Sequence, residues 1–279
     1  MRRAIKKATL VKAVKKLVLK ASFELEPAVE RLLEKAARSE TSAEGRIALA
    51  IIRENLKIAR AKKLPICQDT GLSVFLVELG REARLDFDLE DAINEGLRAA
   101  TAEGYLRRSV ADPLSRKNTG DNAPAIVHLR LVKGNRIKLR LLLKGAGSEN
   151  KSMVRMLTPA DGREGIKKFV REAVTKAGGQ ACPPIFIGLG IGGDLELCAI
   201  LAKRALARPA GLPSKDRELA KLEREILREV NRLGIGPAGL GGKFTCLAVA
   251  AEKAPCHIAS LPVAVNIQCW AHRGGAIAL

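Results

Sequence analysis

The segment Pro65-Ile66-Cys67-Gln68-Asp69-Thr70-Gly71 places a thiol, an amide, a carboxylate and a hydroxyl at four consecutive positions. Pro65 disfavours a helical conformation at the residue before it, and Gly71 can adopt a positive φ, so the segment is predicted to be a loop. Polar groups gathered on a tight loop add little to a hydrophobic core. They are typical of a site where a ligand is bound and polarised.

Two further cysteines lie in similar surroundings far along the chain. Cys182 precedes two prolines, and Cys269 lies between a glutamine and a tryptophan. Cys198 and Cys246 instead lie in apolar runs, which is typical of small buried hydrophobic residues. Cys67, Cys182 and Cys269 are therefore the thiols that we predict to meet in the folded protein.

Three thiolates would leave one iron of a 4Fe-4S cluster with an open position, and an open iron can act as a Lewis acid. The long separations exclude a ferredoxin-type run, so the tertiary structure must assemble any such cluster. Spacing alone leaves two alternatives open. The cysteines could be unpaired structural thiols, or Cys256 and His257 could form a nucleophilic Cys/His pair.

The bulk composition indicates a globular protein. The chain has 279 residues, of which 47% are hydrophobic, enough for one large domain or two modest ones. No run approaches the roughly 18 uncharged apolar residues of a membrane helix, and lysines interrupt the N-terminal segment too often for a secretory signal. We therefore expect a cytoplasmic protein without disulfides and without a membrane contact.

The chain is strongly basic, with 49 Lys and Arg against 30 Asp and Glu and a net charge of +19. Such an excess is common in proteins that bind nucleic acid. Six Phe, one Tyr and one Trp leave few rings to stack on bases, and no helix-turn-helix or zinc-finger spacing is present. An anionic substrate or an acidic partner is the favoured explanation of the charge.

Hydrophobic periodicity predicts an α+β fold, with mixed helices packed on small sheets and the cysteine loops at strand ends. We expect a basic N-terminal helix, partly frayed on the surface, as a segment of its own over 1–22, and the main domain over 23–279. Further helices are expected at 26–36, 42–61, 89–104, 163–177, 194–207, 215–233 and 245–251. Strands are expected at 72–79, 126–132, 136–143, 185–193 and 261–266.

Two of these expectations are specific enough to be tested by packing. The strands 126–132 and 136–143 surround Gly134-Asn135, which is typical of a hairpin turn. In the helix over 42–61, the spacing of Ile47, Ile51, Leu56 and Ile58 predicts that these residues form one buried face.

Several long motifs resemble class I, iron-sulfur fumarases, and the related L(+)-tartrate dehydratases. The similarity is to their α subunit or N-terminal domain and runs in order from about Glu40 to Arg273. Besides the Cys67 loop, the matching segments are Asn118–Asn122, Lys144–Lys151, Cys182–Pro184, Gly188–Gly193, Gly239–Gly242 and His257–Cys269.

The resemblance implies an oxygen-sensitive 4Fe-4S cluster held by Cys67, Cys182 and Cys269. It implies that Gln68, Asp69, Arg107, Gly147 and His257 contact the substrate, with Asp69 and His257 as catalytic residues. Asp69 would act as, or support, the base that removes the C3 proton, and Arg107 would bind a carboxylate, with the adjacent Arg108 as an alternative. Ala146 and Glu149 depart from the usual pattern of the family's Gly-rich loop.

The implied activity is that of a hydro-lyase, the reversible hydration of fumarate to (S)-malate in the tricarboxylic acid cycle. The nearest alternative is the dehydration of L(+)-tartrate to oxaloacetate. The family's second half is missing here, so the resemblance implies a separate β subunit, a hetero-oligomer and a small dicarboxylate substrate. A nucleic-acid-binding module and a non-catalytic iron sensor are the alternatives from other classes.

Overall fold

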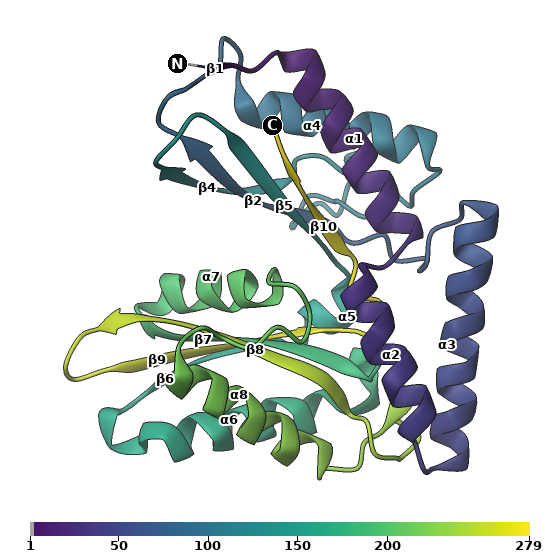
Figure 1. Ribbon diagram of the computed structural model, residues 1–279, viewed down its shortest axis with the longest axis vertical. Helices are drawn as coiled ribbons and strands as arrows, with labels where there is room; N and C mark the ends of the chain where they lie inside the picture. The colour runs from purple at the N-terminus through teal and green to yellow at the C-terminus, as the bar shows by residue number, and fades with distance from the viewer. Residues whose placement is uncertain (1–2) are drawn as a thin grey trace. The chain divides into compact units, whose positions relative to one another are not determined.

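The computed structural model describes residues 3–279, which form two compact units (Figure 1). The first unit consists of Met1–Glu26, Asn55–Ala146 and Arg273–Leu279, and the second of Pro27–Glu54 and Gly147–His272. Each unit therefore joins segments that are distant in the sequence. The domain boundary expected between residues 22 and 23 stays a prediction.

The first unit combines helices with a four-stranded mixed sheet. Its elements are β1 (Arg3–Ala4), α1 (Lys7–Phe23), β2 (Leu72–Gly80), β3 (Ala83–Arg84), α4 (Leu89–Glu103), β4 (Ile126–Val132), β5 (Ile137–Lys144) and β10 (Gly274–Ala278). The strand order of the sheet is β10-β5-β2-β4. β2 pairs parallel with β4 and antiparallel with β5, and β5 pairs antiparallel with β10.

Helix α1 packs its apolar side into the core of the first unit. Leu10, Val14 and Val18 are at most 1% exposed, and they share one core cluster with Phe75 of β2 and Ile93 of α4. The helix predicted at the N-terminus is confirmed over Lys7–Phe23, but this part of it is packed against the core and is not frayed. The apolar residues at helical spacing are buried against α4 and the sheet, while most of the lysines are exposed. Residues 1 and 2 of the expected segment lie outside the described part of the chain.

The predicted strands β4 and β5 exist, but the hairpin between them is wrong. β2 lies between them and pairs with both. The connecting turn wraps around the end of β2, where Gly80 N donates to Arg136 O at 2.8 Å and Glu82 N donates to Gly134 O at 3.0 Å. The residues of β2 are largely buried, so this strand occupies an interior position that the turn residues alone do not reveal.

The second unit is an α/β sandwich on another four-stranded sheet, with the strand order β6-β9-β7-β8. β7 and β8 are parallel, and β9 is antiparallel to both β6 and β7. The elements are α2 (Pro27–Ser39), α3 (Ala43–Lys62, which continues into the first unit), α5 (Ala146–Glu149), β6 (Met153–Leu157), η1 (Pro159–Asp161), α6 (Gly162–Ala177), η2 (Gly178–Ala181), β7 (Ile185–Gly193), α7 (Leu195–Leu206), α8 (Arg217–Asn231), η3 (Pro237–Gly239), β8 (Cys246–Cys256) and β9 (Leu261–Gln268).

Helices cover both faces of this sheet, with α6 and α8 on one face and α7 on the other (Figure 1). The backbone of α7 lies against β7 at Gly188 and Gly190. A Cβ at Gly188 would lie 2.1 Å from Ala202 O, and a Cβ at Gly190 would lie 1.9 Å from Cys198 O. The glycines of β7 are therefore required by the close approach of α7 to the strand.

The helix expected over 245–251 is wrong, because this stretch belongs to strand β8. Cys246 through Val249 are all buried, and a short apolar run of this kind cannot be told from a buried helix by periodicity. Pairing with β7 and packing against α8 decide its conformation.

The predicted buried face of α3 is also wrong. Ile47, Ile51 and Ile58 are 62%, 64% and 43% exposed, whereas Leu49 and Ile52 are at most 7% exposed. Apolar residues occur on two sides of this helix, so spacing alone could not identify the side that packs. The exposed residues define what we call the α3 stripe: Ile47, Ile51 and Ile58.

The α+β class is confirmed, with helices and two separate mixed sheets in the described residues. Over the same range, 3–279, none of the helices has the length and apolar character that crossing a membrane requires.

Candidate functional site

The Cys67 segment is an irregular loop, as predicted, and it leads directly into β2. Its start is fixed by two hydrogen bonds at 2.9 Å, from Ile66 N to Ser22 O and from Asn55 Nδ2 to Ile66 O. Cys67 is half-buried and Gln68 is exposed. The loop therefore presents the thiol and the amide side chain from a braced backbone.

Asp69 connects this loop to the loop that follows β5. Its Oδ1 accepts a hydrogen bond from Gly71 N at 3.0 Å, and its Oδ2 accepts one from Ala146 N at 2.7 Å. Gly71 has a φ of 78°, and a Cβ there would lie 2.7 Å from the carbonyl of Lys144. Asp69 is thus a half-buried carboxylate that two backbone N–H groups hold in place.

Arg107 lies beside the same loop through its backbone. Its carbonyl accepts hydrogen bonds from Thr70 Oγ1 at 2.5 Å and from Asn122 Nδ2 at 2.8 Å. The side chains of Arg107 and Arg108 are both exposed. Asn122, which ends the Asn118–Asn122 motif, also accepts from Ser109 N, so this motif fixes the arginine segment against Thr70.

In the second unit, one backbone hydrogen bond joins Cys182 to the residue that follows Cys269. Trp270 N donates to Cys182 O at 3.1 Å, which brings the segments of Cys182 and Cys269 together at one end of the sheet. Cys182 is exposed and has a φ of 53°, and Cys269 is half-buried. The third predicted ligand, Cys67, belongs to the first unit.

Cys198 and Cys246 differ from these three because both are buried. Burial raises the pKa of Cys246 to about 12, and burial also raises the pKa of Cys198. Both thiols are therefore poor thiolate ligands, as the apolar runs predicted. None of the six cysteines, all of which lie in the described residues, forms a disulfide.

The three predicted ligands are divided between the two units, with Cys67 in the first and Cys182 and Cys269 in the second. Within residues 3–279, no group of three or more His, Cys, Asp and Glu side chains has a metal-binding arrangement. The meeting of all three thiolates stays a prediction.

The Gly-rich loop after β5 forms the single helical turn α5, in which Gly147 has open space. A Cβ there would meet only Gln180 O, at 3.8 Å. Glu149, one of the departures from the family pattern, is an anchor within the second unit. It pairs with Lys203 and accepts from Asn266 Nδ2 at 2.9 Å, so its carboxylate fixes this loop to α7 and β9.

His257 lies at the opposite end of β9 from Cys269. The strand of eight residues between them spans about 26 Å. His257 is exposed on the turn after β8, and its Nδ1 accepts a hydrogen bond from Ala259 N at 3.1 Å. The structure therefore does not bring His257 to the cysteine end of the second unit.

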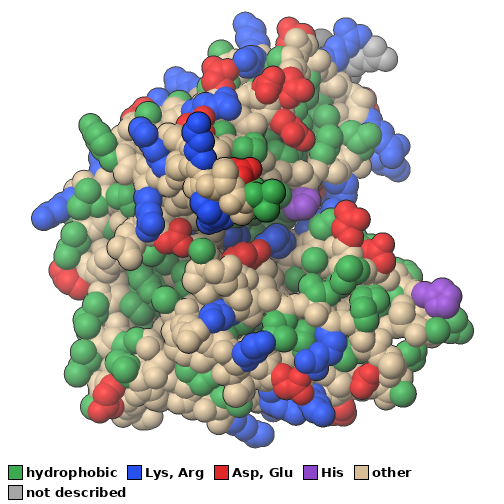
Figure 2. Space-filling view, turned by 180° about the vertical axis from the view of Figure 1, so that it is seen from behind, with side chains coloured by type: hydrophobic (Ala, Val, Ile, Leu, Met, Phe, Trp, Pro, Cys, Tyr) green, Lys and Arg blue, Asp and Glu red, His purple; other side chains and the backbone are tan. Residues whose placement is uncertain are grey.

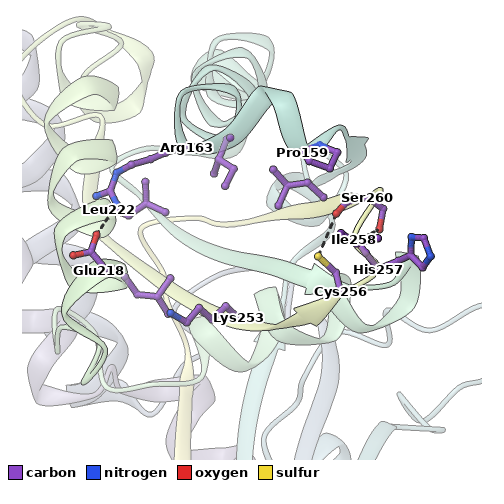
Figure 3. A pocket seen from close by; sticks show the side chains of 13 residues that line it. Pro159, Arg163, Glu218, Leu222, Lys253, Cys256, His257, Ile258 and Ser260 are labelled. Atoms are coloured by element: carbon purple, nitrogen blue, oxygen red, sulfur yellow. Dashed lines mark hydrogen bonds and ion pairs between the residues drawn. The ribbon is translucent and has the colours of Figure 1, made fainter.

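A mainly apolar pocket of about 490 Å³ lies at the His257 end of this sheet. It is lined by residues of α6, α8 and the turn between β8 and β9, including Leu222, Ile258 and Leu261. Figure 3 shows the ring of His257 pointing outward at one edge of the pocket, and the ion pair between Arg163 and Glu218 on the other side. This pocket is distant from Cys182 and Cys269.

The alternative of a Cys256/His257 nucleophile gains no support from this turn. Cys256 Sγ donates to Ser260 O at 3.2 Å, and the ring of His257 accepts at Nδ1 from the backbone N–H of Ala259. The two side chains are bonded to different groups.

The sequence did not single out one residue near Asp69. Arg273 is 1% exposed and directly precedes β10, whose first residue pairs with Leu142 of β5. A Cβ at Gly145 would lie 3.0 Å from Asp69 Oδ2 and 3.8 Å from Arg273 Nη2. The sequence feature that could have identified Arg273 is its position four residues after Cys269, next to a strand end.

A sequence model of the family described as Fumarate hydratase (Fumerase) matches residues 11–278 of this chain. This chain belongs to the fumarate hydratase family. Among its relatives is a protein of Methanocaldococcus jannaschii named "Putative L(+)-tartrate dehydratase subunit alpha". It is 43% identical over 267 residues, which cover 93% of this chain and 94% of that relative.

A more distant relative of this chain is the L(+)-tartrate dehydratase subunit alpha of Escherichia coli K12. It is 32% identical over 243 residues, which cover 86% of this chain and 80% of that protein. The protein of the same name from Shigella sonnei has the same identity and coverage. The family resemblance predicted from the motifs is confirmed by these matches.

Proposed function

We propose that this chain is the α subunit of an iron-sulfur hydro-lyase that hydrates fumarate reversibly to (S)-malate. The observation that carries the proposal is the braced loop Cys67-Gln68-Asp69 at a strand end, with the backbone of Arg107 bonded to Thr70. Membership of the fumarate hydratase family supports the reaction class.

We infer that Cys67, Cys182 and Cys269 hold a 4Fe-4S cluster. Their thiols are half-buried or exposed, unlike Cys198 and Cys246, and Cys182 and Cys269 already lie on hydrogen-bonded segments. Arg273, at a strand end of the first unit, follows Cys269 by four residues, which an extended chain spans in at most about 14 Å. When bound, such a cluster supplies an iron with an open position that acts as a Lewis acid on a substrate hydroxyl.

The side chains of the first unit supply the remaining chemistry. Asp69 removes the proton from C3 of malate, or holds the group that does so, and returns it during hydration. Its two backbone donors hold the carboxylate in a fixed orientation. Gln68 offers an exposed amide to the substrate, and the guanidinium of Arg107 binds one substrate carboxylate through its paired donors.

Two further contacts belong to the proposal. Gly147 offers backbone to the substrate, because the space where a side chain would be is open. His257 can contact a substrate near Cys269 only from another subunit, because about one strand length separates the two residues within this chain.

We also propose a separate β subunit that completes the active site. The relatives from Escherichia coli and Methanocaldococcus jannaschii carry the words "subunit alpha" in their names. The partner would contribute further carboxylate-binding basic groups and a catalytic hydroxyl. The cytoplasmic location expected from the sequence stays a prediction.

The dehydration of L(+)-tartrate to oxaloacetate is the second candidate. It is favoured by the names of the relatives at 43% and 32% identity, both of which refer to tartrate dehydratase. Both reactions are carried out by hydro-lyases, and the hydroxy acids that lose water, (S)-malate and L(+)-tartrate, differ by one hydroxyl group.

The experiment that tests both candidates reconstitutes the cluster anaerobically on the chain together with its β subunit. Turnover of fumarate and of L(+)-tartrate is then compared at equal concentrations. The proposal expects faster hydration of fumarate. Faster conversion of tartrate would select the second candidate, and the absence of turnover on both with an intact cluster would favour an iron sensor. Full activity without the β subunit would contradict the proposed partner.

A further inference from the structure

Arg273 is among the largest fully buried side chains of the protein. It is 1% exposed, and its carbonyl accepts a hydrogen bond from Leu143 N at 3.1 Å. It therefore lies in the first unit, where β5 ends and β10 begins. The Cys67 loop enters the sheet at the same end, since Leu72 of β2 pairs with Lys144 of β5.

The guanidinium of Arg273 has donors without acceptors. Within residues 3–279, its buried Nε and Nη1 have no hydrogen-bond partner. Arg208, a largely buried arginine with a structural role, differs in degree, because only its Nε lacks a partner among the described residues. Its Nη1 donates to Ala251 O at 3.0 Å and its Nη2 donates to Glu223 Oε1 at 2.8 Å. A buried cation without acceptors is unfavourable unless a ligand or partner supplies them.

The surroundings of Arg273 indicate what kind of ligand fits. Asp69 Oδ2 and Arg273 Nη2 both lie close to Gly145, where a Cβ would come within 3.0 and 3.8 Å of them, so a side chain at this position would crowd both groups. Asp69 is held by Gly71 N and Ala146 N rather than by the arginine. A carboxylate group is planar and carries a single charge, so it matches the fork of a guanidinium, whereas the nearby carboxylate of Asp69 disfavours a group that concentrates two charges, such as a phosphate.

We propose that Arg273 binds a carboxylate of the dicarboxylate substrate, beside Asp69. This inference rests on the proposed function and deepens it, because it assigns a second carboxylate-binding arginine to this chain besides Arg107. A substrate held through its carboxylate at Arg273 would lie next to the carboxylate of Asp69, where a proton on the neighbouring carbon can be removed.

The test measures binding separately from turnover. Succinate, a dicarboxylate with no hydroxyl or double bond to react, is titrated calorimetrically into the full-length chain and into two variants, Arg273→Gln and Arg273→Lys. We expect Arg273→Gln to raise the dissociation constant by about 10- to 100-fold, the size expected for a lost charge-assisted pair. Arg273→Lys keeps the charge without the fork and should lie between the two.

Arg208→Gln is the matched control, because it removes another largely buried arginine whose partners all lie within the second unit. It should lower the melting temperature and leave succinate binding unchanged. The proposal is overturned if wild type fails to bind succinate, if Arg273→Gln binds it as tightly as wild type, or if Arg208→Gln weakens binding equally. If Arg273→Gln does not fold, Arg273→Lys provides the test by itself. Succinate binding as tight as that of wild type in Arg273→Lys would then overturn the proposal, because it would show that the guanidinium fork is not needed.

Assays on the reconstituted complex separate this inference from the proposed function. Arg273→Gln should raise KM for the substrate while the brown colour of the cluster and most of kcat persist. If the complex turns over neither fumarate nor tartrate, yet succinate binding still depends on Arg273, the proposed function fails and the carboxylate site stands. If turnover is normal and Arg273→Gln leaves both KM and binding unchanged, the inference alone fails.

Discussion

Asp69 has a geometry that separates its catalytic role from a structural one. We expect Asp69→Asn to keep the cluster colour and to lower kcat by about 10²- to 10⁴-fold, the usual contribution of a general base. The amide can still accept one backbone hydrogen bond through its oxygen, so the loop should fold. Activity and the visible absorbance of the cluster would be measured on the same sample.

The control for this change is Asp86→Asn, which removes an exposed carboxylate in the same unit. It should leave kcat unchanged. Near-normal turnover of Asp69→Asn would mean that the assigned role is wrong.

The cysteines allow a second comparison between single residues. Cys67→Ser should lose iron, brown colour and activity together, because a hydroxyl is a poor replacement for a thiolate ligand. Cys246→Ser, at a buried position whose pKa is raised to about 12, should keep the cluster although the protein becomes less stable. Iron content and absorbance check both. A brown Cys67→Ser protein with full iron would remove Cys67 from the ligand set.

Among the connections between elements, Glu40 holds the junction of α2 and α3 against the loop before β8. It is 5% exposed and accepts from Thr41 N, Lys243 N and Phe244 N at 2.8, 3.0 and 3.2 Å. Burial raises the pKa of Glu40, but the backbone donors outweigh it and hold the pKa below its ordinary value. The folded state therefore stabilises the ionised form of the Glu40 side chain.

Glu40→Gln should therefore lower the free energy of unfolding by about 1–3 kcal/mol at pH 7. Because the folded pKa is lowered, the contribution of Glu40 is present above the ordinary glutamate pKa of about 4.3 and is lost as pH falls through the folded pKa. Urea unfolding of wild type and variant at pH 7 and below pH 4 checks this. A difference that stays constant with pH would contradict it.

Helix α3 provides a comparison between adjacent residues on opposite faces. Ile51 of the α3 stripe is 64% exposed and Ile52 is 7% exposed. We expect Ile52→Ala to cost about 2–5 kcal/mol of unfolding free energy, and Ile51→Ala to stay within about 0.5 kcal/mol. Chemical denaturation of the isolated chain measures both. Equal losses would mean that the stripe is buried in solution.

For the molecule as a whole, the net charge of +19 does not require nucleic acid as a partner. Basic and acidic side chains are interspersed on the face drawn in Figure 2. Between α6 and α8, Lys167 and Arg171 both pair with Glu229, and Arg163 pairs with Glu225. Part of the positive charge therefore lies in ion pairs within the fold.

We accordingly expect weak binding of DNA and RNA that disappears between 50 and about 200 mM salt. Filter binding at two salt concentrations checks this. Tight retention of either nucleic acid at the higher concentration would restore the nucleic-acid-binding alternative.

The local chemistry of the chain was sufficient to predict the loop at Cys67, the helix and strand content, and the family. Cys67, Gln68 and Asp69 are adjacent, and Gly71 and Pro65 act on their nearest neighbours, so no long-range contact is needed to recognise the loop. The apolar runs around Cys198 and Cys246 similarly predicted burial, which the structure confirms.

Contacts between distant segments decided the rest. Strand β2 lies between β4 and β5 because its buried side chains need the interior of the sheet, although Gly134-Asn135 is typical of a hairpin. The packed face of α3, the strand conformation of residues 246–256 and the unpartnered guanidinium of Arg273 follow from packing in the same way. Burial and pairing depend on what a segment meets in the folded chain, and that information is not present in any short stretch of sequence.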